Sequence, residues 1–172
     1  MVIMLVALAV RLYGLWELPL FGDELGVLIR TTGVDLKSLI SQRIMEQDVH
    51  PVGMQLLYYA LYQVVGLSLP WLKLWSVLAS IGSMWFVFKL ARMRSINPWM
   101  ALSCMAVLQI FVFYSTLIRP YAFAQLAVLA YVYTHFRFVK KDRLTWENVL
   151  ILSLLLVAMA TVHYMAVLSG VL

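Results

Sequence analysis

Five apolar runs, separated by short polar turns, constrain this chain more than any other feature of its sequence. Hydrophobic residues make up 64% of the chain and charged residues 12%, which is more apolar material than a soluble core of this size could use. We therefore predict an all-α, polytopic transmembrane helical bundle. The predicted spans cover residues of about 1–15, 74–88, 99–114, 121–136 and 149–168.

Two residues inside these runs carry expectations of their own. The first run leads into Arg11 without a small-residue cleavage site, so we expect it to stay as a membrane anchor. Because the run is short for a span, we expect either that Arg11 reaches out to the interface or that the span starts upstream. Cys104 is the single cysteine, which excludes an intrachain disulfide, and we expect a buried structural thiol.

The segment 16–73 never becomes fully apolar and contains most of the acidic residues, so we predict a large outer loop with short interfacial helices. One helix is predicted behind Asp35, where apolar residues recur at helical spacing up to Ile44. A second is predicted over 54–69, with Gln55, Tyr59 and Gln63 on a polar face. Pro70 ends that run short of the width of a bilayer.

The basic residues test this topology, because they gather at the ends of the apolar runs, where membrane orientation is encoded. With 54–69 on the surface, two basic clusters share one side of the membrane, and the positive-inside rule makes that side cytoplasmic. The net charge of +5 could also indicate nucleic-acid binding, but we see no nucleic-acid motif in the sequence. The clusters are Lys89, Arg92 and Arg94 in one loop, and Arg137, Lys140, Lys141 and Arg143 in the other.

The adjacent carboxylates Asp23 and Glu24 open the outer loop and have two interpretations. One carboxylate could accept a proton from an attacking hydroxyl while the other orients that group or holds a cation. Alternatively, Asp23 could cap a helix that begins here, because Leu25 and Leu28 follow at helical spacing. Taken alone, the pair fits capping slightly better than catalysis.

Other polar residues converge on the same predicted outer face, where ionisable groups at membrane depth tend to line a cavity or bind a ligand. Each also has a structural alternative as a turn residue, a snorkelling lysine or a satisfied interhelical histidine. Arg119 is the strongest candidate for gripping a phosphate. The full set of binding candidates is Asp48, His50, Lys73, Tyr114, Arg119, Tyr121, His163 and Tyr164.

Several short motifs in order resemble the GT-C superfamily of membrane glycosyltransferases, and most closely the dolichyl-phosphate-mannose protein mannosyltransferases (glycosyltransferase family 39) and their bacterial relatives. The resemblance covers essentially the whole chain and implies the N-terminal part of a longer transferase domain. The motifs are Arg-Leu-Tyr-Gly (11–14), Gly-Asp-Glu (22–24), Asp-Val-His-Pro (48–51), Leu-Leu-Tyr-Tyr (56–59), Tyr-Ser-x-x-x-Arg-Pro-Tyr-Ala (114–122) and His-Tyr (163–164).

The resemblance implies an enzyme that moves a sugar from a polyprenyl-phosphate carrier to an unidentified protein, lipid or glycan acceptor, at the outer face of a bacterial inner membrane. Asp23 would be the base or acceptor-orienting residue, with Glu24 beside it, and the basic and histidine positions would hold the phosphate. Leu117 and Val52 depart from the family pattern, which carries an acid and a second proline there. A role for a divalent cation stays open, as does a non-catalytic alternative: a lipid-carrier flippase, a transport component or a degenerate partner-binding relative.

Overall fold

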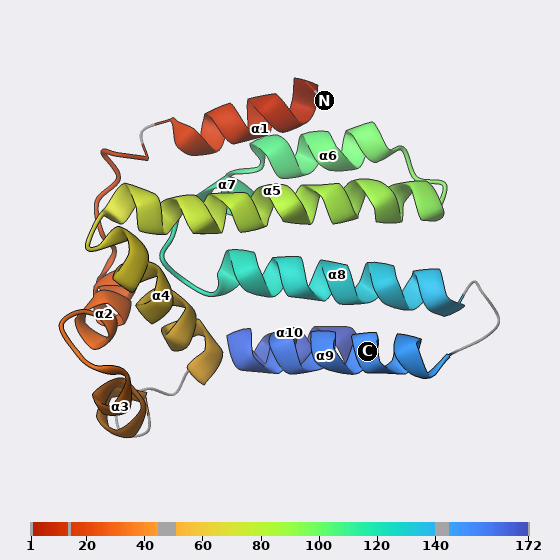
Figure 1. Ribbon diagram of the computed structural model, residues 1–172. Helices are drawn as coiled ribbons and strands as arrows, with labels where there is room; N and C mark the ends of the chain where they lie inside the picture. The colour runs from red at the N-terminus through yellow and green to blue at the C-terminus, as the bar shows by residue number, and fades with distance from the viewer. Residues whose placement is uncertain (1, 14, 45–50, 140–144, 172) are drawn as a thin grey trace.

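The computed structural model describes residues 2–13, 15–44, 51–139 and 145–171, and every regular element among them is helical (Figure 1). The predicted all-α class is therefore confirmed. The helices are α1 (Val2–Leu12), α2 (Gly22–Thr31), α3 (Leu36–Ser38), the π-helix η1 (Leu39–Ile44), α4 (Val52–Val65), α5 (Leu69–Met93), α6 (Pro98–Val107), α7 (Gln109–Ser115), α8 (Tyr121–Val139), α9 (Trp146–Val162) and α10 (Tyr164–Val171).

The long helix α5 organises the bundle. Helices α1 and α6 lie along one side of it, α8 lies along the other, and α9 with α10 lies beyond α8 (Figure 1). By length and composition, α5 is the one helix of the described residues that could cross a membrane alone. Helices α6 and α7 could do so together, as a pair bent by 63°. Pro70 sits in the first turn of α5, where its missing N–H group needs no partner.

Two of the predicted continuous spans are broken, so these predictions were wrong in detail. The run 99–114 divides at Leu108 and the run 149–168 divides at His163, because both residues adopt an extended backbone conformation. After His163 the chain turns back, and α10 lies against α9 and α8 (Figure 1).

Arg11 lies at the first break and is fully buried instead of reaching the interface as expected. Its guanidinium donates hydrogen bonds to the carbonyls of Met105 (2.9 Å) and Ala106 (3.3 Å), in the last turn of α6. Its Nε donates to Ser80 Oγ on α5 at 3.1 Å. Snorkelling is not needed, because these acceptors compensate the charge inside the bundle.

The helices of the polar loop form where they were predicted, but α4 buries a different face from the one expected. Helices α3 and η1 follow Asp35, and α4 covers most of the predicted segment 54–69. Gln55, expected on the solvated face of α4, is buried, whereas Val64 is 82% exposed. Helix α4 is turned this way because it packs between α2 and α9.

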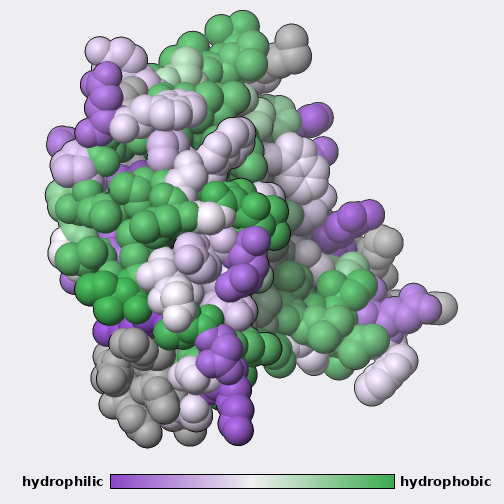
Figure 2. Space-filling model, turned by 60° about the vertical axis from the view of Figure 1, so that its left-hand side comes forward, coloured by the Kyte–Doolittle hydropathy of each residue, from purple (hydrophilic) through white to green (hydrophobic). Residues whose placement is uncertain are grey.

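The end of the molecule that carries α2, α3 and α4 has interleaved polar and apolar patches (Figure 2). Among the large apolar residues exposed on α2 and the segment after it are Leu25, Ile29, Leu36 and Ile40.

Cys104 is exposed on α6, so the prediction of a buried thiol was wrong. The cysteine lies on the face of α6 that turns away from the bundle.

The opposite end gathers the basic residues. The Arg94 guanidinium lies 4.5 Å from the centre of the Phe136 ring, which places the end of α5 beside the end of α8 and its Arg137. Arg94 and Arg137 therefore lie at the same end of the bundle, and their sharing of one side of a membrane stays a prediction. Lys140, Lys141 and Arg143 lie outside the described residues.

Candidate functional site: a charged cavity beside an apolar groove

The acidic pair lies in the first turn of α2, where Phe21 is the N-cap residue and Asp23 and Glu24 follow within the helix. Glu24 Oε2 accepts a hydrogen bond from the Phe21 backbone N–H at 2.9 Å. Glu24 therefore satisfies the helix start from inside the first turn. The hypothesis that Asp23 caps this helix was wrong, because the chain enters the helix two residues earlier than expected.

Glu24 is fully buried and connects distant parts of the chain. Its Oε1 accepts a hydrogen bond from the Ile118 backbone N–H at 2.6 Å and lies 3.8 Å from Lys73 Nζ. Lys73 is also buried and donates to the backbone carbonyls of Leu18 (3.3 Å) and Pro19 (3.2 Å). These contacts fix α2, the start of α5 and the turn before α8 relative to one another.

A second buried contact fixes the same turn. Ser76 Oγ donates to the Leu117 carbonyl at 2.6 Å and lies 3.1 Å from the Tyr58 hydroxyl. Ser76 has only one proton to donate, so the Tyr58 hydroxyl is the donor to Ser76 Oγ. Burial raises the pKa of Tyr58, which keeps that proton in place. The turn that precedes α8 is thus held by side chains from α2, α4 and α5.

The buried contacts also bring Asp23 and Arg119 together, because Asp23 is next to Glu24 in the chain and Arg119 is next to Ile118. Arg119 Nη2 lies 3.6 Å from Asp23 Oδ2, and Nη1 donates to the Asp23 backbone carbonyl at 3.5 Å. The guanidinium also lies 5.7 Å from the centre of the Tyr121 ring. The Asp23 side chain is 76% exposed whereas Arg119 is almost buried, so a solvated carboxylate faces a fixed cation.

These charges border a cavity of about 350 Å³. Aromatic rings close its other walls: Phe21 packs edge-on against Phe113 at 5.3 Å between ring centres, and Tyr114 packs edge-on against Tyr121 at 4.7 Å. The lining residues are Phe21, Gly22, Asp23, Glu24, Phe113, Tyr114, Leu117, Arg119 and Tyr121.

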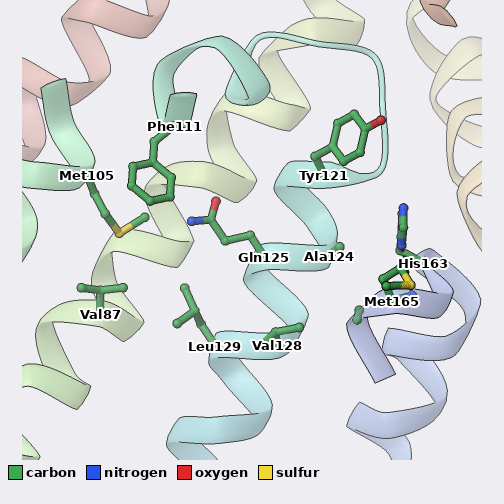
Figure 3. A pocket seen from close by; sticks show the side chains of 11 residues that line it. Val87, Met105, Phe111, Tyr121, Ala124, Gln125, Val128, Leu129, His163 and Met165 are labelled. Atoms are coloured by element: carbon green, nitrogen blue, oxygen red, sulfur yellow. Dashed lines mark hydrogen bonds between the residues drawn. The ribbon is translucent and has the colours of Figure 1, made fainter. Parts of the chain in front are cut away.

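An apolar groove of about 550 Å³ adjoins this cavity, and Tyr121 borders both spaces. Figure 3 shows Tyr121 at the top of α8, with the Gln125 side chain one turn further along pointing towards Phe111. The groove is lined by Val87, Met105, Phe111, Tyr121, Ala124, Gln125, Val128, Leu129, His163, Met165 and Ala166.

His163 borders the groove from the break between α9 and α10. Its Nδ1 accepts a hydrogen bond from the Met165 backbone N–H at 3.2 Å, so the imidazole satisfies one of the free N–H groups in the first turn of α10. Its ring centre lies 6.1 Å from that of Tyr121. Tyr164 is exposed at the start of α10 and lines neither the cavity nor the groove.

The predicted site residues therefore fall into separate groups. Asp23, Arg119, Tyr114 and Tyr121 meet at the cavity, and His163 lies at the adjoining groove. Lys73 was predicted to bind substrate but is buried behind the cavity wall, because Leu18 and Pro19 provide carbonyl acceptors there. Asp48 and His50 lie outside the described residues.

Sequence reasoning missed most of the apolar lining residues, and Phe113 and Gln125 are two examples. Phe113 lies in an apolar run and gave no signal, whereas Gln125 is a lone amide in the run 121–136 and could have been singled out. Across residues 2–13, 15–44, 51–139 and 145–171, no group of three or more His, Cys, Asp or Glu side chains could hold a metal ion.

The geometry combines the exposed Asp23 carboxylate, the fixed Arg119 guanidinium and the adjoining apolar groove. The carboxylate can accept a proton, the guanidinium can bind an anion, and the groove can take a hydrocarbon chain. Comparisons with protein-family models, with curated proteins and with solved structures found no match to this chain.

Proposed function

We propose that the chain forms the donor-binding part of an integral membrane glycosyltransferase that takes a sugar from a polyprenyl-phosphate carrier. The observation that carries the proposal is that Tyr121 lines both a charged cavity and an apolar groove. A lipid-linked sugar has the same two halves, a charged polar head and a long hydrocarbon tail. The motif resemblance described above points to the same class.

The head would lie in the cavity between Arg119 and Asp23. Arg119 presents a planar fork of N–H donors that matches a phosphate, and its burial strengthens the charge-assisted contact. A bound phosphate competes with Asp23 for this cation. Donor binding would therefore release the Asp23 carboxylate for the acceptor.

In the transfer step Asp23 is the general base. The acceptor hydroxyl gives its proton to the carboxylate while its oxygen forms a bond to the anomeric carbon of the sugar. The bond between that carbon and the phosphate oxygen breaks, and its electron pair leaves with the polyprenyl phosphate. Arg119 stabilises the negative charge on the departing phosphate. Glu24 takes no proton in this scheme, because both of its oxygens already accept backbone hydrogen bonds.

The tail would follow the groove, whose walls come from α5, α6, α7, α8 and the start of α10. Its walls are almost entirely apolar, so burying the first part of an isoprenoid chain there is favourable by about 25 cal/mol per Å² of apolar surface. The long α5 supports a place in the membrane. We propose a multi-pass arrangement with the basic end of the bundle in the cytoplasm and the cavity facing outward, in a bacterial inner membrane.

Donor binding by the full-length protein in detergent tests the proposal. Arg119→Gln should weaken binding of a polyprenyl-phosphate sugar about ten-fold or more, because a charge-assisted hydrogen bond contributes about 1.5–3 kcal/mol. Arg137→Gln, the same change at the opposite, exposed end of α8, is the matched control and should leave binding unchanged. Unchanged affinity in a folded Arg119→Gln protein would contradict the proposal. Donor binding without transfer to any acceptor would favour the non-catalytic alternative.

A further inference from the structure

Arg11 is one of the largest fully buried side chains among the residues that the structure describes, and it has no part in the transfer step. Its guanidinium lies among α1, α5 and α6, with Ser80 Oγ at 3.1 Å on one side and the Met105 carbonyl at 2.9 Å on the other. We propose that Arg11 is a positioning residue that holds the bend between α6 and α7 and thereby sets the shape of the groove for the carrier tail. This inference rests on the proposed function.

The bend has a competing straight state. In a continuous helix the carbonyls of Met105 and Ala106 would accept hydrogen bonds from the N–H groups of residues 109 and 110. The extended Leu108 prevents this, and in the bent state Arg11 donates to both carbonyls instead. Without Arg11, the bent state leaves these carbonyls without that donor in an apolar interior, whereas straightening would satisfy them. Arg11 therefore biases the pair towards the bent form.

The bend is part of the groove. The Met105 side chain on α6 and the Phe111 side chain on α7 line the groove from the two sides of the break, and they face the same space (Figure 3). Arg11 bonds to the backbone of Met105 itself. Straightening α6 and α7 would move these two walls relative to each other, so tail recognition would respond more strongly than recognition of the sugar phosphate.

A lysine would not substitute for Arg11. The two carbonyls and Ser80 are reached by different nitrogens of one planar fork, whereas an ammonium group concentrates its donors at a single shorter point. Ser80→Ala removes only the Nε contact and leaves the two carbonyl bonds, so its effect should have the same direction and a smaller size.

The test compares two donors with the same sugar phosphate and with short or long isoprenoid tails, using the full-length protein. The wild-type protein should have a lower KM for the long-tailed donor. In Arg11→Lys and Arg11→Met this KM advantage should shrink about ten-fold, with Ser80→Ala in between. An equal loss for both donors, or an unchanged advantage in folded protein, would overturn the proposal.

Spin labelling tests the bend directly, without an activity measurement and even if one of the variants does not fold. Spin labels on the exposed Cys104 and on Ile110→Cys lie on the two sides of the break. Their coupling should change in Arg11→Lys or Ser80→Ala and stay as in wild type in Arg137→Gln. Unchanged coupling in the folded Arg11 and Ser80 variants would show that Arg11 does not hold the bend. Absence of transfer from either donor by the wild-type protein would instead contradict the proposed function, and the spin-label result would still decide whether Arg11 holds the bend.

Discussion

Glu24 Oε1 accepts a hydrogen bond from the backbone N–H of Ile118 at 2.6 Å, joining residues 94 positions apart in the chain. Glu24→Gln preserves the size of the side chain but turns one of its two acceptors into a donor. Either Phe21 or Ile118 then loses its acceptor, and Lys73 loses its counter-charge. We expect the free energy of unfolding to fall by about 3 kcal/mol, measured by thermal or denaturant unfolding in detergent.

Lys73→Met in the Glu24→Gln background separates the ion pair from the backbone contacts. Removing the cation eliminates a buried charge that has lost its counter-charge, so the double variant should be more stable than Glu24→Gln alone. Equal stability of the single and double variants would show that the Lys73 contact at 3.8 Å contributes little.

Asp23→Asn should abolish most transfer activity without affecting the fold. The side chain is exposed and does not cap α2, so the melting temperature should be unchanged. An amide cannot accept a proton at neutral pH, so turnover should fall roughly 10²–10⁴-fold. Asp35→Asn is the control, since asparagine caps a helix as well as aspartate does. Near-normal turnover in Asp23→Asn would exclude the general-base role.

Gly53→Ala should destabilise the contact between α4 and α9. A methyl group at Gly53 would lie 2.6 Å from the Thr161 carbonyl oxygen, so the two helices would have to separate, at a cost of about 1–3 kcal/mol. Gly26→Ala in α2 meets no atom closer than 3.9 Å and should be neutral or slightly stabilising, because alanine favours helix. Equal melting temperatures of the two variants would contradict this packing.

Cysteine labelling tests the proposed orientation in the membrane. Because Cys104 is exposed, the background protein should carry Cys104→Ser. In intact cells Asp35→Cys should react with an impermeant maleimide, whereas Arg94→Cys should react only after permeabilisation. The reverse pattern would invert the topology, and labelling of both would place both ends of the bundle on the same side.

The sequence was informative about helices and less so about their interruptions. Apolar periodicity predicted the helix order and the helices that follow Asp35. The breaks at Leu108 and His163 were not predictable, because neither residue is a glycine or proline and both lie in apolar runs. The hydrogen bonds at the first break come from Arg11, at a distance in sequence that no local pattern reveals.

The candidate site shows the same division. Charge and motif order predicted that Asp23, Arg119 and Tyr121 belong together, and the structure places them around one cavity. We expected Asp23 to be the base with Glu24 beside it at the reactive end, because the residue order does not show in which direction each side chain leaves the helix. That direction makes Glu24 a buried clamp and leaves Asp23 in contact with solvent.

Tyr121 borders both the charged cavity and the apolar groove, so a ligand that orders its ring from one space would change the binding of a ligand in the other. If a tail in the groove fixes the Tyr121 ring, a head group then entering the cavity meets a wall that is already ordered. Linkage requires the reverse effect to have the same size, so a sugar phosphate without a tail must favour the binding of a separate isoprenoid by the same factor. One aromatic ring would thus let the two halves of a ligand bind cooperatively even when no covalent bond joins them.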